Sequence, residues 1–177
     1  MKEQKDKAFE IFDYGRCYSI AAKNINKWSD THMNFLIPST VNAAFALELY
    51  FKSLYFLEKG KNFKKDNKYS HDISALYKEL NNSTRQNIES VFNELIKKRN
   101  MNDIEDLEKL TGMSFPRDLL GNLIFWKDVF VSVRYIYDGS KKEIKAMFFP
   151  QIEESVLTVI YLLKPDWKNK TILWKKV

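Results

Sequence analysis

The sequence predicts an all-α protein, an up-and-down bundle of four to five main helices. Only five glycines and four prolines occur among 177 residues, which leaves few positions for the tight turns of a sheet. Residues 41–60, VNAAFALELYFKSLYFLEKG, are apolar on almost every side, as is typical of a helix at the centre of a bundle. Most other segments repeat apolar residues at three- and four-residue spacing. Together these observations favour helices packed around one core.

The first two helices are predicted from apolar spacing and from end signals. Residues 3–28 carry the stripe of one amphipathic helix. Ser39 or Thr40, directly after a proline, is expected to be the N-cap of the second helix. Gly60 suits the left-handed position that ends it. Residues 61–70 then form a polar connection with four lysines, long enough to be mobile or functional.

The later helices follow the same rules. Ser70 is expected to cap a third helix, and Ser83-Thr-Arg-Gln86 resembles a capping box that opens a fourth helix, which ends near Arg99. Further helices are expected at 103–111, 119–137 and 150–163, with a strand as the alternative at 129–133. Residues 141–147 are ambiguous.

One domain, residues 1–164, is expected, followed by a basic tail. Residues 101–116 are typical of an insertion into the bundle and not of a second domain. The tail, residues 165–177, alternates tryptophan and lysine and is expected to be a short strand or an extended arm.

Composition excludes several classes of protein. The single cysteine, Cys17, rules out an intramolecular disulfide and a cysteine-based metal site, and its apolar neighbours predict a buried, inert thiol. The charged segment MKEQKDKAFEIF is not typical of a secretory signal, and no apolar run reaches the roughly 18 residues of a membrane span. We therefore expect a cytoplasmic protein with no membrane contact. The net charge of +6 is compatible with a polyanionic partner, although a lysine-rich solvated surface is the simpler explanation.

Known motifs for phosphate loops, dinucleotides and zinc are absent from the sequence. It contains no G-x-x-x-x-G-K-[ST], no G-x-G-x-x-G and no H-E-x-x-H. The two histidines, His32 and His71, are far apart, so no metal site and no cofactor are expected.

Five ionisable residues are the candidates for chemistry. Glu48 and Lys52 lie one turn apart in the apolar helix, either as an intrahelical ion pair or as part of a polar site in a cleft. Arg134 precedes Asp138 by one turn and either binds phosphate or forms a salt bridge to Asp138 or Glu48. His71, beside a helix start, has either a structural or a catalytic role.

The basic tail is a second candidate for binding. Trp167, Lys168 and Trp174 combine aromatic rings with positive charge, which is the pattern of a surface that stacks on bases and contacts phosphates.

Three blocks of the sequence resemble the HEPN domains of prokaryotes. They are ALELYFKSLYF at 46–56, HDISALYKEL at 71–80 and VRYIYD at 133–138. The resemblance implies a helical bundle that is often a homodimer and belongs to toxin–antitoxin, abortive-infection or other anti-phage systems. Many such domains are metal-independent ribonucleases.

The chain departs from the catalytic pattern of that family. Catalytic HEPN domains carry an arginine followed, after four to six residues, by a histidine. Arg134 matches the arginine, but no histidine follows it. Histidine is the usual group for proton exchange near neutral pH. The resemblance therefore implies a non-catalytic module that binds RNA, a nucleotide or a partner protein of a defence system.

Two alternatives remain open from the sequence. One is a metal-independent ribonuclease toxin with a non-standard site made of Arg134, Asp138, Glu48 and His71. The other is a protein-interaction adaptor that docks through its tail or through residues 101–116.

Overall fold

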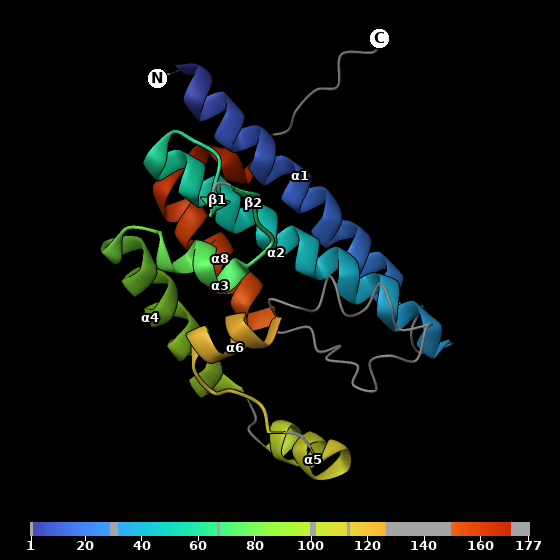
Figure 1. The fold of residues 1–177 in the computed structure, drawn as a ribbon. Helices are drawn as coiled ribbons and strands as arrows, with labels where there is room; N and C mark the ends of the chain where they lie inside the picture. The colour runs from blue at the N-terminus through green and yellow to red at the C-terminus, as the bar shows by residue number, and fades with distance from the viewer. Residues whose placement is uncertain are drawn as a thin grey trace.

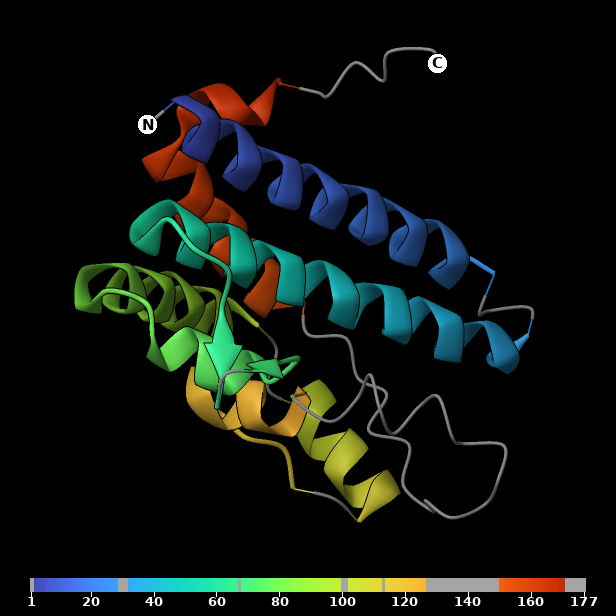
Figure 2. The same ribbon diagram turned by 45° about the horizontal axis from the view of Figure 1, so that its top comes forward.

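Two long antiparallel helices form the frame of the molecule (Figures 1 and 2). α1 spans Lys2–Asn26, and α2 spans Leu36–Lys59 after a short 3-10 helix, η1, at Met33–Phe35. The structure, a computed structural model, describes residues 2–28, 32–66, 68–99, 102–112, 114–126 and 150–170. This part of the chain is mostly helical, so the predicted all-α class is confirmed, while the HEPN-like form of the bundle stays a prediction.

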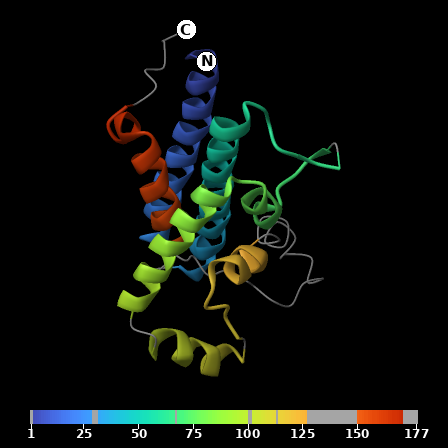
Figure 3. The ribbon, with the colours of Figure 1, turned by 90° about the vertical axis from the view of Figure 1, so that its left-hand side faces the viewer.

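The remaining elements pack around this frame. In chain order they are β1 (Lys64–Lys65), β2 (Lys68–Tyr69), α3 (Ile73–Lys78), α4 (Asn82–Lys98), α5 (Asn102–Thr111), α6 (Leu119–Trp126), α8 (Pro150–Leu163) and η3 (Pro165–Lys168). One buried apolar cluster joins α1, α2, α3, α4, α6, α8 and η3. α5 lies beyond the end of α4 (Figure 3), with Ile104 buried, and its interpretation as part of an insertion stays a prediction.

Small residues and hydroxyls let α1 and α2 approach closely. A side chain at Gly15 would meet the ring of Tyr50 at 2.8 Å. Ser53 Oγ donates to the carbonyl of Ala8 at 2.8 Å, and Ser39 Oγ donates to the carbonyl of Ala22 at 2.9 Å. These buried hydroxyls satisfy their hydrogen-bonding needs across the helix pair.

The predicted N-caps of α2, α3 and α4 are wrong. α2 begins at Leu36, so Ser39 and Thr40 lie inside the helix, and Thr40 Oγ1 donates back to the Leu36 carbonyl at 2.8 Å. Asp72, not Ser70, caps α3 by accepting from the Ala75 N–H at 3.0 Å. α4 begins at Asn82, one residue before the expected capping box.

Two other predicted helix boundaries, at Gly60 and Pro150, are confirmed. Gly60 adopts the left-handed conformation with φ 68°, and its N–H donates to the Phe56 carbonyl at 2.9 Å. The expected helix at 150–163 is confirmed with Pro150 as its first residue.

Two expected elements are confirmed only in part or corrected. The expected helix at 119–137 is confirmed as far as Trp126, and residues 127–149 lie outside the described residues. At 165–168 the tail forms η3, so the expected strand or extended arm is wrong for that stretch. None of the helices in the described part of the chain is long and apolar enough to cross a membrane.

Candidate functional site

Glu48, Lys52 and His71 meet at one place, which we call the polar centre. The Lys52 Nζ atom lies 2.5 Å from Glu48 Oε1, and the His71 Nδ1 atom lies 2.9 Å from Glu48 Oε2. The side chain of Glu48 is 4% exposed, that of Lys52 is 25% exposed and that of His71 is 51% exposed. A buried carboxylate therefore holds two nitrogen donors that extend towards the solvent.

The α2 helix positions two members of the polar centre by its periodicity. Glu48 and Lys52 are four residues apart, so they lie one above the other on the helix surface. A buried ionised carboxylate is tolerated only when it is paired and hydrogen-bonded. Lys52 and His71 provide that pairing, so the intrahelical ion pair is confirmed, while a polar site in a cleft stays a prediction.

The start of α3 positions the third member. Asp72 caps α3 and also accepts from the Ser74 hydroxyl at 2.6 Å and from Lys65 Nζ at 3.0 Å. Burial alone raises the pKa of Asp72, but the hydrogen bonds from Ser74 and Ala75 and the Lys65 ammonium outweigh it and lower this pKa to about 2. His71, the preceding residue, is thereby held against α2.

The contact with Glu48 involves one particular nitrogen of the His71 ring, Nδ1. A carboxylate only accepts, so Nδ1 is the donor in this contact. The second ring nitrogen, Nε2, takes no part in this contact. A carboxylate-oriented imidazole with a half-exposed side chain is able to bind an anion when protonated and to accept a proton when neutral.

Arg134 and Asp138, the other two catalytic candidates, lie outside the described residues, as does Trp174 of the tail. Within the residues that are described, no group of three or more His, Cys, Asp or Glu side chains is arranged to hold a metal ion.

The prediction that Trp167 offers a ring for base stacking is wrong for this fold. Its side chain is 2% exposed, and its ring packs on Phe9 at 5.3 Å and on Phe12 at 5.2 Å between ring centroids. Lys168, its neighbour, is exposed on η3. Trp167 is a core residue, and the tail therefore presents the charge of Lys168 without that ring.

Arg16, which the sequence did not single out, holds η3 in place. Its guanidinium donates to the carbonyl of Lys170 at 2.6 Å and to that of Trp167 at 3.4 Å, and it also pairs with Asp13. The guanidinium lies over the ring of Phe12 at 5.2 Å. The only hint in the sequence was an arginine among aromatic residues on α1.

A second buried polar contact joins α1 to α8. Ser19 Oγ donates to the Glu153 carboxylate, and Lys23 Nζ lies 3.0 Å from Glu153 Oε2. Burial, and then the negative charge of Glu153, raise the pKa of nearby Tyr50. The sequence had a usable signal: Glu153 falls on the same α8 stripe as the buried residues Val156 and Ile160. The Ser19–Glu153 hydrogen bond is buried between the helices, whereas the Lys23 side chain is 55% exposed.

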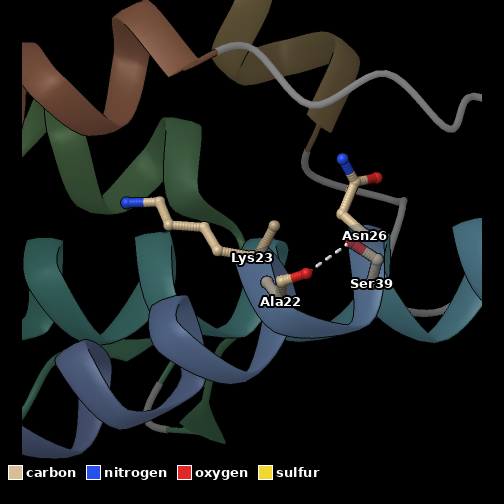
Figure 4. Close-up of a pocket in the computed structure, with 5 residues that line it drawn as sticks. Ala22, Lys23, Asn26 and Ser39 are labelled. Carbon is tan, nitrogen blue, oxygen red and sulfur yellow. Dashed lines mark hydrogen bonds between the residues drawn. The ribbon is translucent and has the colours of Figure 1, made fainter. Parts of the chain in front are cut away.

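A small pocket lies between the end of α1 and the start of α2 (Figure 4). Its volume is about 110 Å³, and it is lined by Ala22, Lys23, Asn26, Ser39 and Ala43. The Ser39 hydroxyl is already bonded to the Ala22 carbonyl. No member of the polar centre lines it, so it is a separate feature.

The prediction of a buried thiol is also wrong, because Cys17 is exposed on the outer side of α1. Its neighbours in sequence are Arg16 and Tyr18, and Tyr18 is exposed as well.

Comparisons with protein-family models, with curated proteins and with solved structures find no match to this chain. The three residues of the polar centre lie within the segments 46–56 and 71–80 of the chain.

Proposed function

We propose that this protein is a HEPN-like module of a prokaryotic defence or toxin–antitoxin system and that it binds RNA at the polar centre. The observation that supports this proposal is the meeting of Lys52 and His71 on the buried carboxylate of Glu48. The ammonium and the imidazole are partly exposed, so a phosphate group has access to two nitrogen donors.

The choice of RNA among anionic ligands comes from the resemblance to HEPN domains. The same resemblance implies a homodimer, which is part of this proposal. The adaptor alternative, with docking through residues 101–116 or the tail, has no contact in the described residues that favours it over RNA.

A binding measurement tests the proposal. We expect Lys52→Gln and His71→Asn each to weaken binding of a fluorescent single-stranded RNA about tenfold, the loss of roughly one charge-assisted hydrogen bond. His71→Asn is a mild change, because the asparagine amide replaces Nδ1 as donor to Glu48 while Nε2 is lost. Fluorescence anisotropy gives the dissociation constants.

The matched control is Lys109→Gln on α5. The Lys109 side chain is 74% exposed and makes an ion pair with an aspartate one turn away, as Lys52 does with a glutamate. Its loss removes the same charge at a distant place. If all three variants bind RNA as the wild type does, the polar centre is not the RNA site.

One observation favours RNA cleavage as a second candidate function. Glu48 orients the His71 ring through Nδ1, which is the arrangement of a general base supported by a carboxylate. In that reaction Nε2 takes the proton of a ribose 2′-hydroxyl, the 2′-oxygen bonds to phosphorus, and the 5′-oxygen leaves with a proton from water. The product is a 2′,3′-cyclic phosphate.

The same RNA distinguishes binding from cleavage. Incubation with the purified protein in the presence of a chelator, followed by a denaturing gel, shows whether the strand is cut. Cleavage by the wild type that disappears in His71→Asn supports the ribonuclease. If the RNA stays intact although the protein has bound it to saturation, only the RNA-binding function is supported.

A further inference from the structure

A lysine-rich hairpin lies directly beside the polar centre. We call residues 61–66 and 68–69, which include β1 and β2, the lysine arm. β1 and β2 pair antiparallel, with Lys64 opposite Tyr69 and Lys65 opposite Lys68. Figure 3 shows the arm leaving the end of α2, extending to the side of the helices and returning to α3.

The lysine arm is anchored at two points. Phe63 is 5% exposed, and its ring packs edge-on against Tyr55 of α2 at 5.4 Å between centroids. The Lys65 ammonium pairs with Asp72 at 3.0 Å. An arm held by a buried aromatic ring and by an ion pair is preorganised, so a ligand does not bear the entropy of ordering it.

The exposed surface of the lysine arm is positively charged. Lys61, Lys64 and Lys65 are exposed, and the stretch 61–72 contains four lysines against two aspartates. The hydrogen bond and the charge of Asp72 raise the pKa of Lys65. Lys65 therefore keeps its positive charge across the physiological range.

The chain itself connects this charge to the polar centre. β2 ends at Tyr69, and His71 follows two residues later. Asp72 contacts the arm through Lys65 and holds the helix start from which His71 reaches Glu48. A strand that places one phosphate at the polar centre therefore has its neighbouring phosphates close to the arm.

We infer that the lysine arm is the backbone-binding surface of the RNA site, contacting phosphates that flank the one bound at Lys52 and His71. This inference rests on the proposed function, because it takes the polar centre as the point where RNA binds. It makes Lys61 and Lys64 sequence-independent contacts, since phosphates carry no base information.

Neutralising the arm tests the inference. The variant is Lys61→Gln/Lys64→Gln, which leaves the Lys65–Asp72 anchor intact. Each phosphate contact on a single strand contributes a slope of about −0.7 to the plot of log binding constant against log salt concentration. We therefore expect the slope to become shallower by about 1.4 and the affinity for a 12-nucleotide RNA at 0.1 M salt to fall roughly 25-fold.

The length of the ligand provides the decisive comparison. A mononucleotide reaches only the polar centre, so its affinity is expected to be unchanged in the arm variant and lowered in Lys52→Gln. The control is Lys97→Gln/Lys98→Gln at the end of α4, on the opposite side of the molecule (Figure 3), which removes the same charge. We expect this control to leave the salt slope unchanged.

The outcomes separate the arm from the centre. If the arm variant binds long RNA as the wild type does, or no worse than the α4 control, the role of the lysine arm is overturned. The proposed function still holds in that case if Lys52→Gln loses binding. If Lys52→Gln and His71→Asn also bind RNA normally, the proposed function and the role of the lysine arm are both overturned.

Discussion

Glu48 shows how one residue sets the chemistry of its surroundings. A carboxylate with 4% exposure in an apolar helix needs compensation, and Lys52 and His71 supply it from two different elements. Removing either partner leaves the remaining charge less well paired. Conservative replacements such as His71→Asn are therefore more informative about binding than alanine, because they keep the hydrogen bond to Glu48.

Asp72 is the residue for which the structure predicts a pH dependence. Its pKa is about 2 in the folded protein and 3.8 in the absence of perturbation. Ionised Asp72 therefore stabilises the fold above pH 3.8, and this stabilisation is lost as the pH falls through about 2. Asp72→Asn keeps a capping side chain but removes the charge.

We expect Asp72→Asn to lower the free energy of unfolding at pH 7 by about 1 kcal/mol, after allowance for solvent screening of this partly exposed group. Near pH 2, the folded pKa of Asp72, the difference in unfolding free energy between the variant and the wild type should shrink to a few tenths of a kcal/mol. Urea denaturation at the two pH values measures it. Asp106→Asn on α5, where the side chain is 73% exposed, is the control and should show no such trend. A difference for Asp72→Asn that does not change with pH would contradict the prediction.

At the scale of elements, the close contact of α1 with α2 depends on Gly15. Alanine is the better helix former by about 1 kcal/mol. Here, however, its Cβ atom would lie 2.8 Å from the ring of Tyr50 and 3.3 Å from the backbone oxygen of Ala46. Tyr50 is 1% exposed, so its ring has no room to move away. The clash therefore outweighs the gain in helix propensity.

We expect Gly15→Ala to lower the free energy of unfolding by about 1–2 kcal/mol, the range for overpacking a dense core. Thermal or urea denaturation followed by circular dichroism gives this value. Cys17→Ala, two residues later on the exposed side of α1, should stay within about 0.5 kcal/mol of the wild type. A stabilised Gly15→Ala variant would mean that the two helices adjust to the extra methyl group.

The elements that sequence predicted well are those governed by local backbone preference. Gly60 ends α2 and Pro150 begins α8, because φ preferences act on the residue itself. The N-cap of α2 was predicted less well, because a distant partner competes for the Ser39 hydroxyl. Ser39 bonds to Ala22 of α1 instead of capping α2, and no local pattern announces that contact.

The candidate site follows the same division. The Glu48–Lys52 pair was predicted, since both residues lie on one helix. The contact of His71 with Glu48 needed the fold, because it depends on how α3 begins against α2. The burial of Trp167 was missed for the same reason: its partners Phe9 and Phe12 are at the other end of the chain.

At the scale of the whole molecule, η3 closes the fold by packing on α1. Trp167 fills a space between aromatic rings, and Arg16 bonds to the carbonyls of Trp167 and Lys170. The segment after α8 is thus part of the hydrophobic core. Its loss is expected to affect the stability of the entire bundle.

We expect Trp167→Ala to lower the free energy of unfolding by about 3–5 kcal/mol, as is usual when a buried aromatic side chain is truncated. Trp28→Ala is the matched control. The Trp28 side chain is 57% exposed, so its replacement should cost under about 1 kcal/mol. Equal effects of the two variants in urea denaturation would show that η3 does not contribute to the core.

The residues of the lysine arm and the polar centre lie close together in the sequence, unlike the residues that pair across the helices. Glu48, Lys52, the arm and His71 all lie between residues 48 and 72, whereas Ser19 and Glu153 are separated by 134 positions. A single genetic exchange of that short stretch would therefore move all of these residues together, while the contact of His71 with Glu48 still depends on how α3 packs against α2. The contacts that hold the scaffold together join residues far apart in the chain, so no single short stretch contains them.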